Sequence, residues 1–153
     1  MLTGDKLETA ENIAHSCRLI TGEMHVMRTF GKTADEVHQK LKSNKEEFTL
    51  CMNEKRKKAF IVEGEALGNP FFFEKISHLP LLAFILANPE MEELLISMIL
   101  HCEAVVVCRA TPRQKADMVR IVKTRTGKIT LAIGDGANDV NMIQAANIGN
   151  FFS

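Results

Sequence analysis

The chain has 153 residues, which is enough for one domain with a substantial hydrophobic core. Its 19 basic and 19 acidic residues cancel, so electrostatics gives no reason to expect nucleic acid as a partner. The four cysteines show no metal-site spacing, and we expect reduced thiols that mostly fill the core.

The first twenty residues predict the end of a strand followed by a helix. Met1-Leu2 leads into Thr-Gly-Asp instead of a basic and then apolar run, so we expect no signal peptide and a soluble chain. Asp5 with Glu8 has the capping-box pattern for a helix. The apolar positions of that helix are Leu7, Ala10, Ile13, Ala14 and Cys17. The Thr3 hydroxyl, the Gly4 amide and the helix N-terminus together resemble a phosphate cradle, although Thr-Gly-Asp alone is usually a turn. Residues 18–20 predict a short strand.

The charged middle of the chain predicts an exposed amphipathic helix from Thr33 and then a loop over residues 53–58. The helix has sparse apolar positions at Val37, Leu41, Phe48 and Leu50. The basic run over residues 55–58 is either simply solvated, which is the commoner case, or in contact with anionic lipid head groups. Residues 59–63 predict a strand, and Gly64-Glu65 a possible turn into a second short strand.

Phe71-Phe72-Phe73 is the most conspicuous apolar cluster, and we expect it to be buried, with an interaction patch as the alternative. The longest apolar run, from Leu79 to Ala87, is too short to span a bilayer. Asn88-Pro89 begins a helix, because proline suits a first turn. The buried stripe of this helix comprises Met91, Leu94, Leu95, Met98 and Ile99. Residues 104–108 form a continuous apolar run, which is typical of a parallel strand covered on both faces.

Thr111 and Pro112 predict the start of a further helix, with threonine as the N-cap and proline in the first turn. The helix ends at about Thr126, where Gly127 is a natural terminator. Lys115 falls in the first turn and opposes the helix dipole, so an anionic partner would explain its place. An ordinary surface lysine is an equally good interpretation of this motif alone.

Residues 129–133 predict a buried strand that ends in the turn Gly134-Asp135-Gly136. Asn138 or Asp139 can cap the next helix. The apolar positions that we expect to face the core from this helix are Val140, Met142, Ile143 and Ala146. A strand that ends in such a turn before a helix suits phosphate and a divalent cation, and two aspartates four residues apart offer the oxygen ligands that Mg²⁺ prefers. A lone Gly-Asp-Gly turn would more often be a solvated corner.

Three motifs occur here in one order: residues 3–5 (Thr-Gly-Asp), 111–115 (Thr-Pro-Arg-Gln-Lys) and 134–139 (Gly-Asp-Gly-Ala-Asn-Asp). This set resembles the phosphorylation domain of P-type ATPases, which belong to the haloacid-dehalogenase-like superfamily. The longer stretches 1–13 and 130–146 look like the phospholipid-flippase branch in particular. The resemblance implies an α/β fold with a Rossmann-like parallel sheet flanked by helices, truncated at its N-terminus. It also implies a partial phosphorylation domain over residues 1–153, with a family-specific insertion at about 21–100.

The resemblance implies roles for the Thr-Gly-Asp motif and its neighbours in binding ATP. Thr3 and Gly4 would hold the transferring phosphoryl group, and Thr3 would take part in catalysis. Asp5 would belong to the network that binds nucleotide and magnesium. Arg109 would contact the nucleotide, and Lys115 would act in catalysis by neutralising the charge of the phosphoryl group.

The third motif would supply the metal site. Asp135 would ligate Mg²⁺, Asn138 would hydrogen-bond the phosphate, and Asp139 would support the metal site. The nucleophile of the family is the aspartate of an Asp-Lys-Thr-Gly motif, which does not occur in this sequence. We therefore expect the chain to lack ATPase activity by itself. Residues 147–149 begin like the next strand of the family, and residues 150–153 depart from it.

In the parent that the resemblance implies, ATP hydrolysis through an aspartyl phosphate would drive phospholipid to the cytosolic leaflet. That parent would be a membrane protein with this domain on the cytosolic side, in contact with its other domains and with a small membrane-embedded accessory subunit. Two other functions stay open. One is a stand-alone haloacid-dehalogenase-like phosphatase, which would need an aspartate nucleophile on an N-terminal strand. The other is a non-catalytic interaction module that uses Phe71–Phe73 and the insertion.

Overall fold

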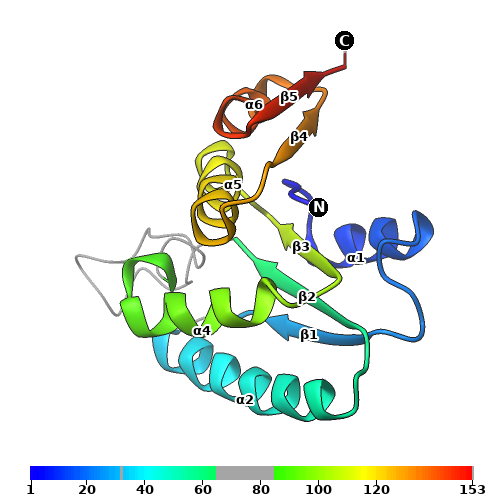
Figure 1. Ribbon diagram of the computed structural model, residues 1–153, viewed down its shortest axis with the longest axis vertical. Coiled ribbons are helices and arrows are strands. Elements are labelled where there is room, and N and C mark those ends of the chain that lie inside the picture. The colour runs from blue at the N-terminus through cyan, green and yellow to red at the C-terminus, as the bar shows by residue number, and fades with distance from the viewer. Residues whose placement is uncertain (32, 65–84, 153) are drawn as a thin grey trace.

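The computed structural model describes residues 1–31, 33–64 and 85–152. Helices and strands alternate along the described chain, as expected for an α/β fold (Figure 1). In order, the elements are α1 (Leu7–Ser16), β1 (His25–Thr29), α2 (Ala34–Asn53), β2 (Lys58–Glu63), α4 (Pro89–Ile99), β3 (Ala104–Cys108), α5 (Pro112–Thr126), β4 (Leu131–Gly134), the short 3-10 helix η1 (Ala137–Asp139), α6 (Val140–Ala145) and β5 (Ile148–Phe151).

The larger sheet is parallel and has the strand order β1-β2-β3. The N-terminal residues extend it beyond β3, because Leu2 forms a parallel bridge with Val107. The Thr3 N–H donates to the Val107 carbonyl at 2.9 Å, and the Val107 N–H donates to the Met1 carbonyl at 2.8 Å. The prediction that the first residues end a strand is therefore confirmed.

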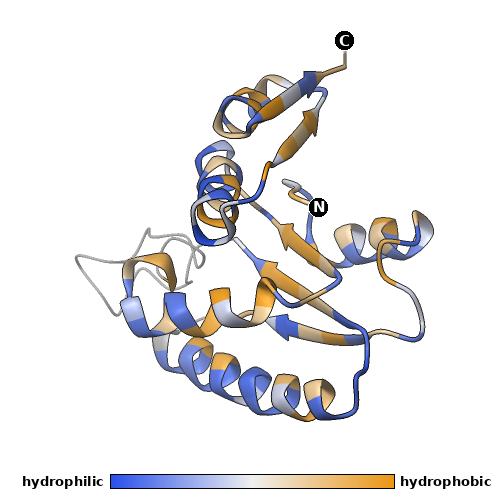
Figure 2. Ribbon diagram, viewed as in Figure 1, coloured by the Kyte–Doolittle hydropathy of each residue, from blue (hydrophilic) through white to orange (hydrophobic). Residues whose placement is uncertain are grey.

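Each face of this sheet has its own hydrophobic core. Successive side chains of a strand point to opposite faces, so Phe60 and Val62 join the core formed with α2 and α4. Ala59 and Ile61 join the core on the α1 side, where Ala10 and Ala14 are completely buried. Burial on both faces explains the hydrophobic colour that runs along β2 and β3 in Figure 2.

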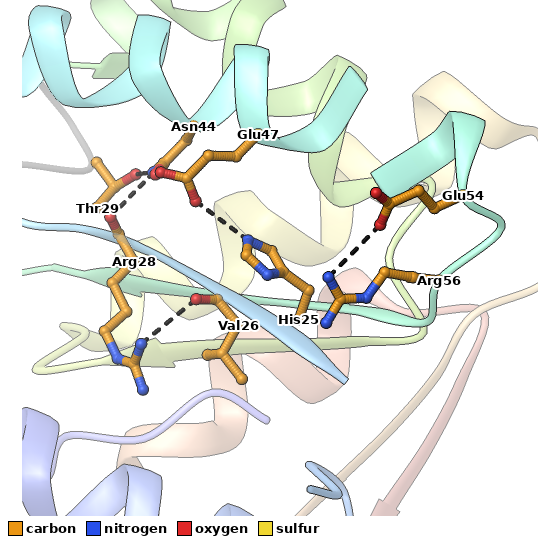
Figure 3. Close-up of polar contacts among 8 residues, drawn as sticks. All are labelled: His25, Val26, Arg28, Thr29, Asn44, Glu47, Glu54 and Arg56. Carbon is orange, nitrogen blue, oxygen red and sulfur yellow. Dashed lines mark hydrogen bonds and ion pairs between the residues drawn. The ribbon is translucent and has the colours of Figure 1, made fainter. Parts of the chain in front are cut away.

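Helix α2 is fixed on β1 by polar contacts as well as by its apolar face (Figure 3). The completely buried Asn44 amide donates to the Arg28 carbonyl at 2.9 Å and to the Thr29 hydroxyl at 2.8 Å. Nearer the start of β1, His25 Nε2 lies 3.1 Å from a Glu47 carboxylate oxygen. These contacts set how α2 lies along the strand.

The last two strands form a separate parallel sheet, β4-β5, with α6 as its crossover. Helix α6 packs against α5, and in Figure 1 the N-terminus lies between β3 and β4. An apolar pocket of about 210 Å³ lies between the two sheets. Its lining comprises Met1, Leu2, Ile99, Val105, Met118, Val119, Val122, Thr130 and Leu131.

The strand predicted over 129–133 exists as β4, but the expectation that it is buried is wrong. Its Ala132 is buried, whereas Leu131 and Ile133 are 59% and 54% exposed. Partners in a parallel pair point to the same face, so Ile148 of β5, opposite Leu131, continues this apolar surface and is 55% exposed. Helix α6 covers the other face, and Met142 is buried there while Val140 stays 40% exposed, against prediction.

The prediction for residues 18–20 is also wrong. These residues form a turn in which Arg18 has a left-handed backbone (φ 59°), and the strand follows later, as β1. The capping box of Asp5 and Glu8 does not form either. The N-cap position of α1 is Lys6, without a side-chain hydrogen bond, and Asp5 instead bonds to Thr3.

The middle of the chain mostly follows prediction. Thr33 caps α2 by accepting the Glu36 N–H at 3.2 Å, although Leu50, unlike the other expected apolar positions, is 62% exposed. In the basic run only Lys58 is buried, with its Nζ donating to the Arg56 carbonyl at 2.9 Å. In α4, Leu94 was predicted to be buried but is only partly buried. Ile96, which was not among the predicted positions, is buried. Phe71–Phe73 lie outside the described residues. The turn expected at residues 64–65 lies at their border, because residue 64 is described and residue 65 is not.

All four cysteines are free thiols, and two of them are buried. Burial raises the pKa of Cys102 to about 12 and that of Cys108 to about 11, so both stay protonated near neutral pH. Cys17 is exposed, and the expectation of core fillers thus fits only part of the set.

Candidate functional site

Polar residues follow the carboxyl ends of the strands, where ligands bind in open α/β sheets. The Thr3–Asp5 turn follows the N-terminal strand segment, Gly64 follows β2 and Arg109 follows β3. Gly134 ends β4 and leads into Asp135 and η1. The three sequence motifs therefore all stand at strand ends.

The Thr3–Asp5 turn is tied to the end of β3. The Thr3 hydroxyl donates to an Asp5 carboxylate oxygen at 2.6 Å and accepts the Asp5 N–H at 3.1 Å. Two backbone bonds continue the attachment: the Arg109 N–H donates to the Asp5 carbonyl at 2.8 Å, and the Ala110 N–H donates to the Thr3 carbonyl at 2.9 Å. Gly4 is exposed, and a Cβ at this position would have no atom within 4 Å, so the space beside the turn is open.

Arg109 has a strained backbone with a φ of 49°, in the left-handed region that L-residues rarely adopt. The two bonds from residues 109 and 110 to the Thr3–Asp5 turn hold it there. Its guanidinium Nε lies 3.1 Å from Glu63 Oε1 at the end of β2. The backbone of Arg109 is thus held beside the turn, whereas its guanidinium pairs with Glu63 at the end of β2.

Lys115 and Asp139 form a buried ion pair in which Nζ lies 2.8 Å from Oδ1. Lys115 reaches this place because α5 starts just before it, with Pro112 in its first turn and a capping box between Thr111 and Gln114. Burial by itself would raise the pKa of Asp139. The hydrogen bond and charge of Lys115 and the backbone N–H groups of the turn outweigh burial, and the pKa lies below its ordinary value.

Gly134 is required by the packing of Asp139. A Cβ at position 134 would lie 2.4 Å from the Asp139 Cβ, a distance that real side chains do not reach. The next residues are more open, because the side chains of Asp135 and Asn138 are exposed. Asp139 occupies the N-cap position of α6 without making a side-chain cap bond, so the predicted capping role is replaced by the ion pair with Lys115.

The structure therefore forms two clusters from the predicted residues. One joins Thr3, Asp5 and Arg109, and the other joins Lys115 and Asp139. Asp135 and Asn138 stand exposed beside the second cluster.

Sequence reasoning assigned no role to three residues next to these clusters, Glu63, Gly64 and Gln114. Gln114 was detectable, because a glutamine three positions after a threonine N-cap is the capping-box pattern. Glu63 and Gly64 show no local signal, and only the fold brings them to Arg109 and Gln114.

The exposed side of the third motif is chemically suited to Mg²⁺. Within residues 1–31, 33–64 and 85–152, no three or more His, Cys, Asp or Glu side chains cluster so that they could hold a metal ion by themselves. Magnesium usually takes only one or two protein carboxylates and completes its shell with water and substrate phosphate. Asp135, whose carboxylate makes no hydrogen bond or ion pair within the described chain, fits such a shared site.

No protein-family model matches the chain. The chain is 39% identical over 152 residues to the phospholipid-transporting ATPase DRS2 of Saccharomyces cerevisiae. It is 41% identical over 153 residues to the phospholipid-transporting ATPase tat-1 of Caenorhabditis elegans. It is 36% identical over 169 residues to the phospholipid-transporting ATPase ID of Homo sapiens.

These alignments cover 97% of this chain but only 10%, 12% and 13% of the respective relatives. The chain thus spans about a tenth of the length of the curated relatives that it matches. In the part of the chain that the structure describes, no helix has both the length and the apolar character needed to cross a membrane. Over nearly its whole length, the chain is therefore similar to one segment of the phospholipid-transporting ATPases.

Proposed function

We propose that the chain acts as part of the phosphorylation domain of a phospholipid-transporting ATPase and lines the site at which ATP phosphorylates the enzyme. The observation that carries the proposal is the buried Lys115–Asp139 pair at the start of α5, beside the Gly134–Asp135 turn. A buried cation at a helix N-terminus needs a compensating anion. In the proposed site the same ammonium would also face the oxygens of the phosphoryl group.

The Thr3–Asp5 turn would bind the phosphoryl group from the side of the larger sheet. The backbone amide of the exposed Gly4 is a hydrogen-bond donor of the kind that preorganised phosphoryl-transfer sites use. The Thr3 hydroxyl, which here donates to Asp5, would turn from that carboxylate to donate to the phosphate. Arg109, held beside this turn, would contact the nucleotide, and Asp5 would contribute to the network around nucleotide and metal.

Asp135 would hold Mg²⁺, and Asp139 would support the metal site from its fixed position against Lys115. The exposed Asn138 would donate its amide to the phosphate. Bound Mg²⁺ would supply electrostatic stabilisation of the charge on the transferring group. The work of this chain's own residues is to position the phosphate and to neutralise its charge.

We further propose that a strand from another part of the parent inserts between the N-terminal strand segment and β4 and carries the nucleophilic aspartate. The apolar pocket there, lined by Leu2, Val105 and Leu131, supports this placement. Strand β4 supports it too, because among the described residues it pairs only with β5, so its other edge is open to a further strand.

In the parent, ATP hydrolysis would drive phospholipid to the cytosolic leaflet, with this domain on the cytosolic side and with the other domains and a small membrane-embedded accessory subunit as partners. The relatives named above are all phospholipid transporters, which does not favour a stand-alone phosphatase. The interaction-module alternative depends on Phe71–Phe73, which lie outside the described residues.

A chimera tests the proposal. The matching segment of the Saccharomyces relative is replaced by this chain, with which it shares 39% identity over 152 residues, and the acid-stable phosphoenzyme formed from labelled ATP is measured. We expect phosphoenzyme in the chimera and its loss with Asp135→Asn, because the metal would lose a charged ligand. The exposed Arg113→Gln serves as the control. Phosphoenzyme at the normal level in the Asp135→Asn chimera would refute the assignment.

A further inference from the structure

The side-chain amide of Gln114 ties the start of α5 to the end of β2. Gln114 is only 3% exposed. Its Nε2 donates to the Gly64 carbonyl at 2.9 Å, and its Oε1 accepts the Thr111 N–H at 2.7 Å. Both ends of the amide are therefore bound, one to each element.

Gly64 is held tightly on the other side of this contact. Its N–H donates to the Cys108 carbonyl at 2.7 Å. A Cβ at position 64 would lie 2.9 Å from the Arg109 carbonyl oxygen and 3.1 Å from the Ala110 Cα, so only glycine fits against this backbone. We call the contact among Gly64, Thr111 and Gln114 the Gln114–Gly64 latch.

The latch stands immediately before Lys115. Lys115 is 7% exposed, it lies in the first turn of α5 where the helix dipole disfavours a cation, and its ammonium is 2.8 Å from Asp139. A small rotation of that first turn would carry Nζ away from the carboxylate. Contacts that fix this turn therefore help to hold the pair.

We propose that Gln114 is a positioning residue: its bond to Gly64 keeps the first turn of α5 in the orientation in which the Lys115 ammonium reaches Asp139. The inference rests on the proposed function, because that function gives Lys115 its role. Through the bond to Gly64, the end of β2 would help to set the position of the Lys115 ammonium, which is the cation that would neutralise the phosphate charge.

Amine acetylation of the intact chain, mapped residue by residue by mass spectrometry, tests the latch. In the wild type we expect Lys115 to react slowly, because it is buried. We expect the same of Lys58, a second buried lysine at the far end of β2, which reports on overall opening. With Gln114→Leu, we expect the Lys115 rate to rise about fivefold relative to that of Lys58, the change in opening equilibrium that one net hydrogen bond gives.

Two further variants approach the latch differently. Gln114→Glu keeps the acceptor for the Thr111 N–H but loses the donor to Gly64, and we expect a similar rise at neutral pH. In Gly64→Ala the new methyl group would press on the backbone of Arg109 and Ala110, which would shift residue 64 and its carbonyl without changing the sequence of α5, and we expect the same result. Arg113→Gln, whose side chain is 90% exposed on the same helix, is the matched control and should leave the ratio unchanged.

Two results would overturn the inference. If Lys115 and Lys58 become reactive together, the latch only supports overall stability. If Lys115 stays protected in Gln114→Glu, the bond to Gly64 does not position it, and this variant decides the question should Gln114→Leu fail to fold. The labelling uses neither ATP nor membrane, so its outcome is independent of whether the chimera forms a phosphoenzyme.

Discussion

Asp139 can reach Lys115 because residue 134 is a glycine and leaves room for the Asp139 side chain. In Gly134→Ala the new Cβ would lie 2.4 Å from the Asp139 Cβ, so Asp139 must move and the 2.8 Å bond to Lys115 must lengthen or break. We expect a loss of about 1–3 kcal/mol in the free energy of unfolding, as for other overpacked sites. Urea unfolding monitored by circular dichroism measures it.

Gly136→Ala is the matched control for this prediction, because it changes the same turn. The nearest atom to a Cβ at position 136 is 3.9 Å away, which is an ordinary contact. We expect the urea midpoint of this variant to stay close to that of the wild type. Equal losses in the two variants would show that the turn as a whole, and not the contact with Asp139, sets the cost.

The pKa of Asp139 predicts how stability depends on pH. Its folded-state pKa lies below the ordinary value, so the pair with Lys115 stabilises the fold above the unfolded pKa of about 4. This contribution is lost as the pH falls through the folded pKa. Asp139→Asn should remove this acid dependence and cost about 3 kcal/mol at pH 7, because it leaves a buried ammonium without its carboxylate.

Unfolding curves at several pH values between 3 and 7 test this prediction. The control is Asp117→Asn, which breaks an exposed pair with Arg120 at 2.8 Å and should cost no more than about 1 kcal/mol. If Asp139→Asn follows the same pH curve as the wild type, the acid sensitivity of the chain comes from other carboxylates.

At the scale of elements, the closeness of α1 to the sheet depends on two alanines. Ala10 and Ala14 are completely buried against Ala59, Ile61 and Val106. Ala10→Leu adds three carbons to a filled interface, and we expect it to lower the free energy of unfolding by about 1–3 kcal/mol. The exposed neighbour Thr9 provides the control Thr9→Leu, for which guanidinium unfolding should show little change. Tolerance of leucine at position 10 would mean that α1 packs loosely.

The sequence predicted those elements whose local signal agrees with their packing. Helix α5 has a cap, a proline and a terminal glycine, and β3 is a continuous apolar run, so both were found with nearly their true bounds. Strand β1 was missed because His25, Arg28 and Thr29 interrupt its apolar pattern and are satisfied by partners such as Asn44 on α2. Those partners are distant in sequence and leave no local signal.

The candidate site was predictable to a similar extent. The motifs placed Lys115 and the Gly134–Asp139 turn at the right ends of their elements. They did not reveal that Lys115 binds Asp139, because that contact depends on how α5 lies against the turn. The role of Gln114 was hidden for the same reason: its partner Gly64 is 50 positions away.

At the scale of the molecule, the described residues form two parallel sheets, which differ in how much of each is covered by hydrophobic packing. The larger sheet has a core on each face, and the N-terminal segment extends it. The β4-β5 sheet has α6 on one face and exposed Leu131, Ile133 and Ile148 on the other. Two strands alone are marginal, and exposed apolar strands promote association. The two sheets should therefore differ in stability and in their tendency to bind other chains.

Hydrogen exchange of the isolated chain tests this difference. We expect the amides of β4 and β5 to exchange at least about tenfold faster than those of β2 and β3, because local opening follows the burial of apolar contacts. We also expect the chain to associate more as its concentration rises, because association would bury the exposed apolar face of the β4-β5 sheet. Analytical ultracentrifugation measures this association. Ile133→Lys should reduce that association. Leu50→Lys is the control, because Leu50 on α2 is exposed to a similar extent as Ile133 but lies outside this sheet, and it should not reduce the association. A monomer with equal protection in both sheets would show that β4 and β5 are stable without a further strand, and the strand that we place beside β4 would lose its main support.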